Sequence, residues 1–219
     1  DYQSIKKRKP EIVMLSSCLM GQTGPMNMYP GFGNLAGALS GFYEITGWPD
    51  RPPTGPFLAY TDYTAPRFTV TALMAAVDHR NRTGEGVYVD LSQHESALHL
   101  LGPALLDQAV NSRTATRSGN ISDRYDVHGV YPTVGDDKWI AIVCQDETAQ
   151  EQLSELIGST PLHDSAIAEW ASSQDRFELQ DLLQSRGIAA HVVVDSADAL
   201  ADPQLTHRNH FRRVPQAYS

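Results

Sequence analysis

Glycine and proline clusters interrupt residues 21–86 and divide this stretch into short regular elements joined by long loops. The densest clusters predict loops over 21–34 and 46–61, and loops of this length inside a compact domain are usually functional. Apolar periodicity predicts helices over 35–45 and 64–82, one on each side of the second loop. The inward face of the second helix is expected to hold Phe68, Thr71, Leu73, Met74, Ala76 and Val77.

Asp62 is the acidic residue at the junction between the second loop and the helix that follows it. The apolar run 56–59 precedes it, and Pro66 is expected in the first turn, where its missing N–H costs nothing. A carboxylate just before a helix is stabilised by the helix dipole and by backbone N–H groups. It then acts either as a helix cap or as an ionised nucleophile toward a carbonyl or thioester. Because caps are common and nucleophiles are rare, the spacing by itself favours the cap.

The remaining patterns alternate between strands and helices, which is typical of an α/β fold. A continuous apolar run within 11–19 has the character of a strand buried in a parallel sheet. The other expected strands are 87–91, 138–144 and 189–194, and the other expected helices are 2–9, 92–110, 147–157, 164–172 and 175–186.

At 219 residues the chain is long enough for one large domain or two small ones. A polar stretch without apolar periodicity separates two groups of predicted elements. We therefore predict a large-domain portion over 1–120, a linker over 121–132 and a small α/β domain over 133–205. The last segment, 206–219, is predicted to be a tail that returns to the first domain.

Charge and composition argue against several classes of protein. The net charge is −9 and the pI is about 5.2, whereas nucleic-acid-binding surfaces are usually basic. The basic run 6–9 ends a predicted helix, where cations complement the helix dipole. The sequence has neither the long apolar run of a membrane span nor the pattern of a signal peptide. Cys18 and Cys144 lie in separate apolar segments, so we expect a cytoplasmic protein without a disulfide framework or metal site.

Other motifs that suggest chemistry are weak when each is taken alone. His94 and His99 are five residues apart, which separates them by about 140° around a helix and excludes a helical zinc pair. A single histidine in a turn, such as His128, is usually a packing or hydrogen-bonding residue. Gly21 and Gly24 follow neither dinucleotide nor phosphate-loop spacing, so they form a turn or line a ligand closely.

Several short segments nevertheless occur in the order seen in one enzyme family. They are 21–25 (Gly-Gln-Thr-Gly-Pro), 30–32 (Pro-Gly-Phe), Thr46-Gly47 with Pro52-Pro53, Asp62, 82–86 (Arg-Thr-Gly-Glu-Gly) with Val89-Asp90, 128–132 (His-Gly-Val-Tyr-Pro) and 201–203 (Ala-Asp-Pro). With these segments the chain resembles the family III CoA-transferases, the group that includes formyl-CoA and carnitine CoA-transferases. The resemblance implies that family's α/β fold, with part of a Rossmann-like large domain plus a small α/β domain.

The resemblance also changes the interpretation of Asp62, because the family's catalytic aspartate occupies this position. It implies that Asp62 attacks a donor acyl-CoA to give a mixed anhydride and CoA thiolate, and that an enzyme–CoA thioester follows. Coenzyme A would enter as a thioester substrate, and no tightly bound cofactor is expected. Backbone N–H groups of the glycine-rich loops would stabilise the oxyanions.

By position in the motifs, Gly21, Gln22, Gly31 and Phe32 would line the acyl or pantetheine pocket, and His128 would shape its closing edge. The α-methylacyl-CoA racemase branch of the family places a histidine where this chain has Phe32. Phenylalanine cannot move a proton, so racemisation by that two-base route is not expected. A racemase or isomerase that uses a different base remains an alternative.

The family's N-terminal portion, which supplies much of the Rossmann-like sheet and the arginines that hold the CoA nucleotide, has no counterpart in this sequence. Family membership implies an interlocked homodimer with acyl-CoA and carboxylate substrates. A non-catalytic alternative is a CoA-binding or dimerisation fragment in which Asp62 only caps a helix. The donor and acceptor acids are not encoded in a motif.

Overall fold

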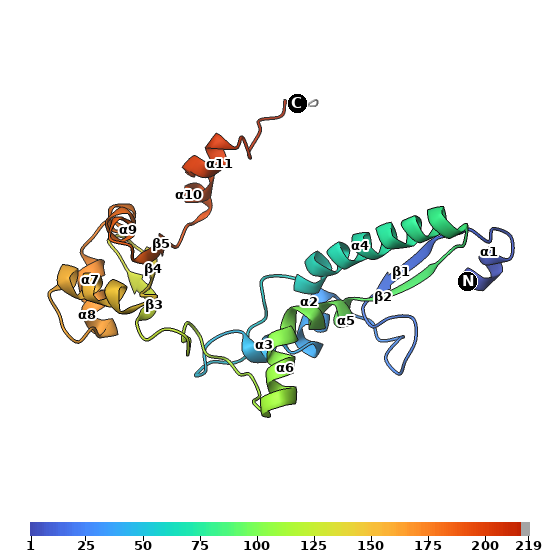
Figure 1. Cartoon of the computed structure of the whole chain (residues 1–219), viewed down its shortest axis with the longest axis horizontal. Helices are drawn as coiled ribbons and strands as arrows, with labels where there is room; N and C mark the ends of the chain where they lie inside the picture. The colour runs from blue at the N-terminus through green and yellow to red at the C-terminus, as the bar shows by residue number, and fades with distance from the viewer. Residues whose placement is uncertain (216–219) are drawn as a thin grey trace. The chain divides into compact units, whose positions relative to one another are not determined.

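The computed structural model of the chain describes residues 1–215, and two compact units divide between Gly119 and Asn120 (Figure 1). Both units combine helices with strands, as the predicted α/β class requires. No helix within residues 1–215 combines the length and apolar character that a membrane crossing requires.

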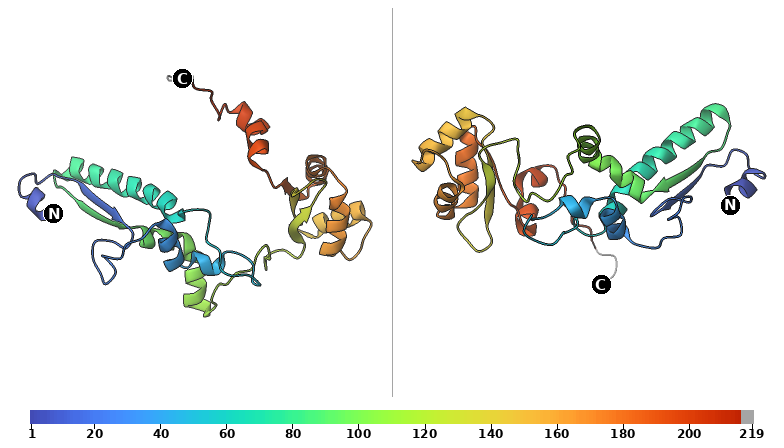
Figure 2. Two further views of the ribbon diagram at one scale, coloured as in Figure 1. Left: turned by 180° about the vertical axis from the view of Figure 1, so that it is seen from behind. Right: turned by 90° about the horizontal axis from the view of Figure 1, so that it is seen from below.

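The first unit contains a two-stranded parallel sheet, and α4 runs alongside both strands (Figures 1 and 2). Strand β1 pairs with β2 in parallel, as expected, in a register that joins Met14 to Tyr88 and Cys18 to Ser92. The expected burial of β1 is not found, because its residues are only half-buried or exposed in the structure. The elements of this unit are α1 (Tyr2–Lys6), β1 (Met14–Cys18), α2 (Gly33–Leu39), α3 (Phe42–Ile45), α4 (Tyr60–Thr83), β2 (Tyr88–Ser92), α5 (Gln93–Leu98), the 3₁₀ turn η1 (His99–Leu101) and α6 (Gly102–Asn111).

Two of the predicted helices are broken in the structure. The helix expected over 35–45 divides into α2 and α3 at Gly41, whose φ of 98° lies in the left-handed region that glycine adopts readily. The helix expected over 92–110 divides into α5, η1 and α6. Pro103, in the first turn of α6, has no N–H to continue the hydrogen-bond ladder of the preceding turn.

Helix α4 begins at Tyr60, earlier than predicted, so Asp62 is its third residue. Pro66 therefore lies inside the helix and not in its first turn. There it removes the hydrogen bond that its N–H would otherwise donate to the carbonyl of Asp62.

The predicted inward face of α4 is only partly right. Phe68, Ala76 and Val77 are buried or half-buried, but Thr71, Leu73 and Met74 are exposed. The residues of α4 that are buried are Thr61, Thr64, Ala65 and Ala76. Because these side chains are small, α4 packs closely against α2 and α5.

The first unit has a small core and a large exposed apolar surface. Its buried cluster consists of Phe42, Ala97 and Leu101, with Ile45 and Tyr60 packed against it. The exposed large apolar side chains on α4 and α6 are Tyr63, Val70, Leu73, Met74, Leu105, Leu106 and Val110. Large apolar side chains left exposed in such numbers are typical of regions that contact another polypeptide segment.

The second unit is a three-stranded antiparallel sheet, with β4 between β3 and β5. Its elements are β3 (His128–Pro132), β4 (Trp139–Val143), α7 (Glu147–Ile157), α8 (Asp164–Ser172), α9 (Arg176–Ser185), β5 (Ala189–Val192), α10 (Ser196–Ala201) and α11 (Pro203–His207). The predicted positions of β4, α7, α8, α9 and β5 agree with these bounds to within two residues.

The second unit departs from the prediction at both ends. β3 occupies the last five residues of the predicted linker, 121–132, because its backbone pairs with β4 from His128 to Pro132. The short helices α10 and α11 were not predicted, although Asp195 and Asp202 cap their first turns. Residues 216–219 of the predicted tail lie outside the described residues, and its return to the first unit stays a prediction.

The core of the second unit lies between the sheet and α7, α8 and α9. Ile140 and Ile142 alternate with less buried residues along β4, as in a strand with one covered face. Leu153, Ile167 and Leu183 are almost completely buried and come from the three helices. This unit therefore has a continuous apolar core of its own.

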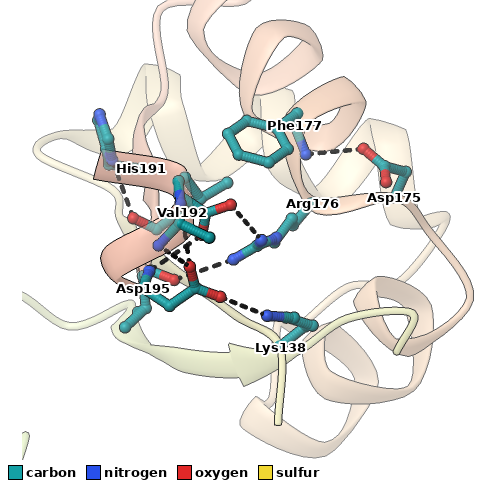
Figure 3. Close-up of polar contacts among 10 residues, drawn as sticks. Lys138, Asp175, Arg176, Phe177, His191, Val192 and Asp195 are labelled. Atoms are coloured by element: carbon teal, nitrogen blue, oxygen red, sulfur yellow. Dashed lines mark hydrogen bonds and ion pairs between the residues drawn. The ribbon is translucent and has the colours of Figure 1, made fainter. Parts of the chain in front are cut away.

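Polar contacts join α10 to the sheet and to α9 (Figure 3). The buried Arg176 donates to the carbonyl of Val193 at 3.1 Å and forms an ion pair with Asp198 at 2.8 Å. Lys138 Nζ lies 2.7 Å from Asp195 Oδ2. The hydrogen bond from Lys138 is the main cause that lowers the pKa of Asp195 to about 2.

We predict that Arg176→Met destabilises the second unit. The variant leaves Asp198 with a largely buried, unpaired charge, and removing one partner of a buried ion pair costs about 3 kcal/mol or more. Urea denaturation would measure the loss. Arg186→Met is the matched control, because this exposed arginine contacts only Gln152 in the residues described and should change the free energy of unfolding by less than about 0.5 kcal/mol. Equal effects of the two substitutions would contradict the role given to Arg176.

Candidate active site

The candidate site lies where the carboxyl ends of β1 and β2 meet. In parallel α/β sheets, ligands bind at this end of the strands. The loop after β1 passes through Gly21 and Gln22, while α5 begins at Gln93, directly after β2. Leu19, just after β1, accepts hydrogen bonds from the His94 N–H and the Ser92 hydroxyl, so the two strand ends are joined.

Asp90 on β2 holds the loop that begins at Gly21. Its two carboxylate oxygens accept the backbone N–H of Gln22 at 3.0 and 2.9 Å. Gly21 has a φ of 87°, a conformation that favours glycine, and a Cβ atom added there would lie 3.7 Å from Asp90 Oδ1. The side chain of Gln22 is directed back to Cys18, whose Sγ lies 3.3 Å from Nε2. The carboxylate in the Val89-Asp90 motif thus orients a backbone segment.

Asp62 lies in the first turn of α4, but it is not the helix cap. Ala59 occupies the N-cap position and makes no side-chain capping bond. The Asp62 N–H donates to the Ala59 carbonyl at 2.9 Å. Its side chain is exposed, and none of the described residues forms a hydrogen bond or ion pair with the carboxylate. The cap interpretation is therefore wrong, and the carboxylate is available to a ligand.

The Asp62 carboxylate packs directly against Gly33, the first residue of α2. A Cβ atom added at Gly33 would lie 2.7 Å from Asp62 Cγ and 2.8 Å from Asp62 Oδ2. Phe32 precedes this glycine as the N-cap residue of α2, with 80% of its surface exposed. Gly31 is enclosed by Leu19 and Leu35, which leave no room for a side chain. The structure therefore places Asp62 next to the segment 31–33.

The start of α5 is hydrogen-bonded to both neighbouring helices. Gln93 Oε1 lies 3.1 Å from the hydroxyl of Thr61, on α4. His94 Nδ1 lies 2.9 Å from the hydroxyl of Ser40, at the end of α2. Thr61 also donates to the carbonyl of Gly33 at 2.9 Å. These contacts join the three helices around Asp62.

Sequence reasoning missed the residues that build this arrangement. Gly33 and Thr61 lie in segments that the sequence analysis had singled out, beside the motif 30–32 and beside Asp62, but neither was given a role, and Gln93 was not considered. Their contacts join positions far apart in sequence. The available signals were the adjacency of Thr61 to Asp62 and of Gly33 to the motif 30–32.

His128 belongs to the second unit, as the first residue of β3. Its Nε2 accepts the N–H of Ser122 at 2.8 Å, so a neutral ring carries its proton on Nδ1. Nδ1 is buried and has no hydrogen-bond partner among the described residues. The predicted contact of His128 with substrate stays a prediction.

The histidines of α5 and η1 have structural partners. His94 pairs with Ser40, and the ring of His99 stacks on Phe68 with centroids 5.4 Å apart. Within residues 1–215, no group of three His, Cys, Asp or Glu side chains is arranged to hold a metal ion.

Two surface hollows are lined by residues other than Asp62. One, of about 740 Å³, lies on the face of α4 that includes Tyr63, Thr64 and Arg67. At about 100° per residue, this face is directed away from Asp62. The other, of about 780 Å³, lies in the second unit beside α7. Neither hollow is part of the candidate site, which is an open surface in the first unit.

The sequence profile of CoA-transferase family III matches residues 1–218. The chain therefore belongs to this family, as the resemblance of its motifs implied. The fold is the family's α/β fold: a CaiB/BaiF family protein from Brucella suis superposes with a TM-score of 0.86 over 95% of this chain and 59% of that chain, at 24% identity.

Curated relatives with similar sequences are CoA-transferases. The succinyl-CoA–D-citramalate CoA-transferase of Chloroflexus aurantiacus is 27% identical over 94% of this chain and 56% of its own length. The succinyl-CoA:mesaconate CoA-transferase of Haloarcula marismortui is 29% identical over 98% and 59%, respectively. The acetyl-CoA:oxalate CoA-transferase of Acetobacter aceti is 28% identical over 95% and 58%. The chain thus spans just over half the length of these relatives.

We predict that Gly33→Ala displaces the Asp62 side chain and destabilises the first unit. The added methyl group would overlap Asp62 Cγ and the backbone carbonyl of Ala59, which lies 2.8 Å from the Cβ position. Overpacking of this kind costs about 1–3 kcal/mol, which thermal or urea unfolding would measure.

Gly102→Ala provides the matched control for this substitution. Gly102 starts α6 in a right-handed helical conformation, and no atom lies within 4 Å of its Cβ position. The change should leave stability unchanged or raise it by up to about 1 kcal/mol. A Gly33→Ala variant as stable as Gly102→Ala would contradict the close contact at Gly33.

Proposed function

We propose that the protein containing this chain transfers coenzyme A between an acyl-CoA donor and a carboxylic acid, with Asp62 as the covalent nucleophile. One observation carries the proposal. The Asp62 carboxylate is exposed at the carboxyl ends of the parallel strands and has no partner among the described residues. The names of the curated relatives, all CoA-transferases acting on carboxylic acids or their CoA esters, support the reaction class.

The proposed reaction divides one acyl exchange into balanced carbonyl substitutions. An Asp62 carboxylate oxygen attacks the donor thioester carbonyl, the C–S bond breaks, and CoA leaves as the thiolate. The thiolate then attacks the Asp62 carbonyl of the mixed anhydride, which releases the donor carboxylate and leaves an Asp62–CoA thioester. The acceptor carboxylate attacks this thioester and expels the thiolate again. Attack of the thiolate on the acceptor's carbonyl then gives the new acyl-CoA and regenerates Asp62.

The glycine segments beside Asp62 are the proposed substrate-binding surface. Gly21 and Gln22 form the loop that Asp90 holds, and Gly31 with Phe32 lead directly to the glycine under Asp62. Backbone without side chains lets the acyl or pantetheine group approach closely. We also propose that His128 contributes to substrate binding, on its motif alone.

Two other functions remain as alternatives. A racemase or isomerase would need a base beside Asp62, but Phe32 occupies the adjacent position and cannot exchange a proton. Deuterium incorporation at the α-carbon of an acyl-CoA in deuterated water would favour that alternative. A non-catalytic CoA-binding or dimerisation fragment would bind CoA without turnover, but the loss of the cap role of Asp62 removes its main support.

We further propose that the protein acts in the cytoplasm as a homodimer. The large apolar side chains that α4 and α6 expose support the assembly, because exposed apolar side chains of this size are often covered by another chain segment. The chain spans just over half of its relatives, so the rest of the polypeptide or a second copy can supply that segment.

Activity of the Asp62→Asn variant tests the proposal. The complete natural polypeptide would be assayed with a panel of acyl-CoA donors and dicarboxylic acceptors, with the new thioester measured by mass spectrometry. Asn keeps the shape of the side chain but cannot form the anhydride, so kcat should fall by about 10³-fold or more.

Asp78→Asn is the control for this assay. Asp78 lies on the same helix, is exposed and pairs only with Arg82 among the described residues. Its removal should leave kcat within about twofold, since exposed ion pairs contribute little. Transfer by Asp62→Asn at the wild-type rate would exclude Asp62 as the nucleophile.

A further inference from the structure

We propose that Thr61 is a positioning residue, which holds Gly33 against α4 and thereby fixes the Asp62 carboxylate for attack. The inference rests on the proposed function and adds to it a residue that contacts no substrate. Thr61 precedes Asp62 in the first turn of α4 and is completely buried, with 0% of its surface exposed. A buried hydroxyl without partners would cost about 1–3 kcal/mol, so its contacts are structurally required.

The hydroxyl of Thr61 has two partners on two other helices. Its Oγ1 lies 2.9 Å from the Gly33 carbonyl oxygen on α2 and 3.1 Å from the Gln93 side chain on α5. A hydroxyl has one proton to donate and accepts through its lone pairs. Both contacts are satisfied when Thr61 donates to Gly33 and the Gln93 amide is turned so that its nitrogen donates to Thr61.

Thr61 and Asp62 contact the same residue of α2 through adjacent side chains. Thr61 binds the carbonyl of Gly33, while the Asp62 carboxylate lies on its Cα. A shift of α2 away from Thr61 would therefore also move the surface on which the carboxylate rests. The Thr61–Gly33 hydrogen bond therefore sets the distance between Asp62 and the segment 31–33.

Positioning matters here because the carboxylate has no hydrogen bond of its own within the described part of the chain. Its orientation depends on packing against Gly33. A nucleophile must lie about 3–3.5 Å from the carbonyl carbon, and a displacement of 1 Å can cost about 10²-fold in rate. Thr61 supplies the fixed contact that the carboxylate lacks.

Three variants of the complete polypeptide test this role. Thr61→Val keeps the volume but removes the hydroxyl, and kcat for CoA transfer should fall by about 10- to 100-fold with KM within about threefold. Thr61→Ser retains the hydroxyl and should recover kcat to within about fivefold of wild type. Thr69→Val is the matched control, because its hydroxyl donates only within its own helix, to Ala65 at 3.0 Å, and kcat should not change.

A second readout does not require turnover and separates the two proposals. The rate at which a water-soluble carbodiimide modifies Asp62 would be measured by mass spectrometry, with the exposed Glu85 as internal reference. Thr61→Val should raise the ratio of Asp62 to Glu85 modification at least threefold, and Thr61→Ser should restore it. If the wild-type protein shows no transferase activity while Thr61→Val still raises this ratio, the proposed function is wrong and the positioning role stands.

Two results would overturn the positioning role itself. The first is a Thr61→Val variant with wild-type kcat and wild-type Asp62 modification. The second is a Thr61→Ser variant as impaired as Thr61→Val, since the hydroxyl would then be irrelevant.

If Thr61→Val fails to fold, the kcat values of Thr61→Ser and Gln93→Leu still test the positioning role. Gln93→Leu removes the other partner of the hydroxyl and should lower kcat in the same direction, whereas wild-type kcat in Gln93→Leu would contradict the network.

Discussion

The close approach of α4 to α2 at Gly33 is the contact on which the arrangement of the site depends. Only a glycine permits it, because any Cβ would overlap both the Asp62 side chain and the Ala59 carbonyl. Thr61 adds a hydrogen bond to the same residue, and Gln93 extends the contact to α5. Three helices that begin in different parts of the sequence thus meet around one carboxylate at the ends of two parallel strands.

The two units reach stability in different ways. The second unit encloses an apolar core between its sheet and three helices, and a buried arginine holds α10 in place. The first unit has a small core and exposes large apolar side chains along α4 and α6. The candidate nucleophile lies in the unit with the smaller buried core and the larger number of exposed apolar side chains on its helices.

Most strands and helices follow from apolar periodicity, and the middle of the second unit, from β4 to β5, was predicted to within two residues because its core is local and continuous. The errors have specific causes. Gly41 and Pro103 interrupt patterns that remain periodic across the break, and small residues such as Thr61 and Ala65 form the packed face of α4 where larger residues were expected. Asp62 was selected as the candidate nucleophile from its position and its motif, and that role stays a proposal. Its contact with Gly33 was not predictable, because the two residues are far apart in sequence and glycine gives no periodic signal.

Covalent trapping at Asp62 tests the central claim most directly. The complete polypeptide would be incubated with each acyl-CoA donor, treated with hydroxylamine, digested and analysed by mass spectrometry. An anhydride or thioester at Asp62 reacts with hydroxylamine to give a hydroxamate at that residue, so the account predicts this modification only when a productive donor is present. Turnover of a donor without any hydroxamate at Asp62 would contradict the account.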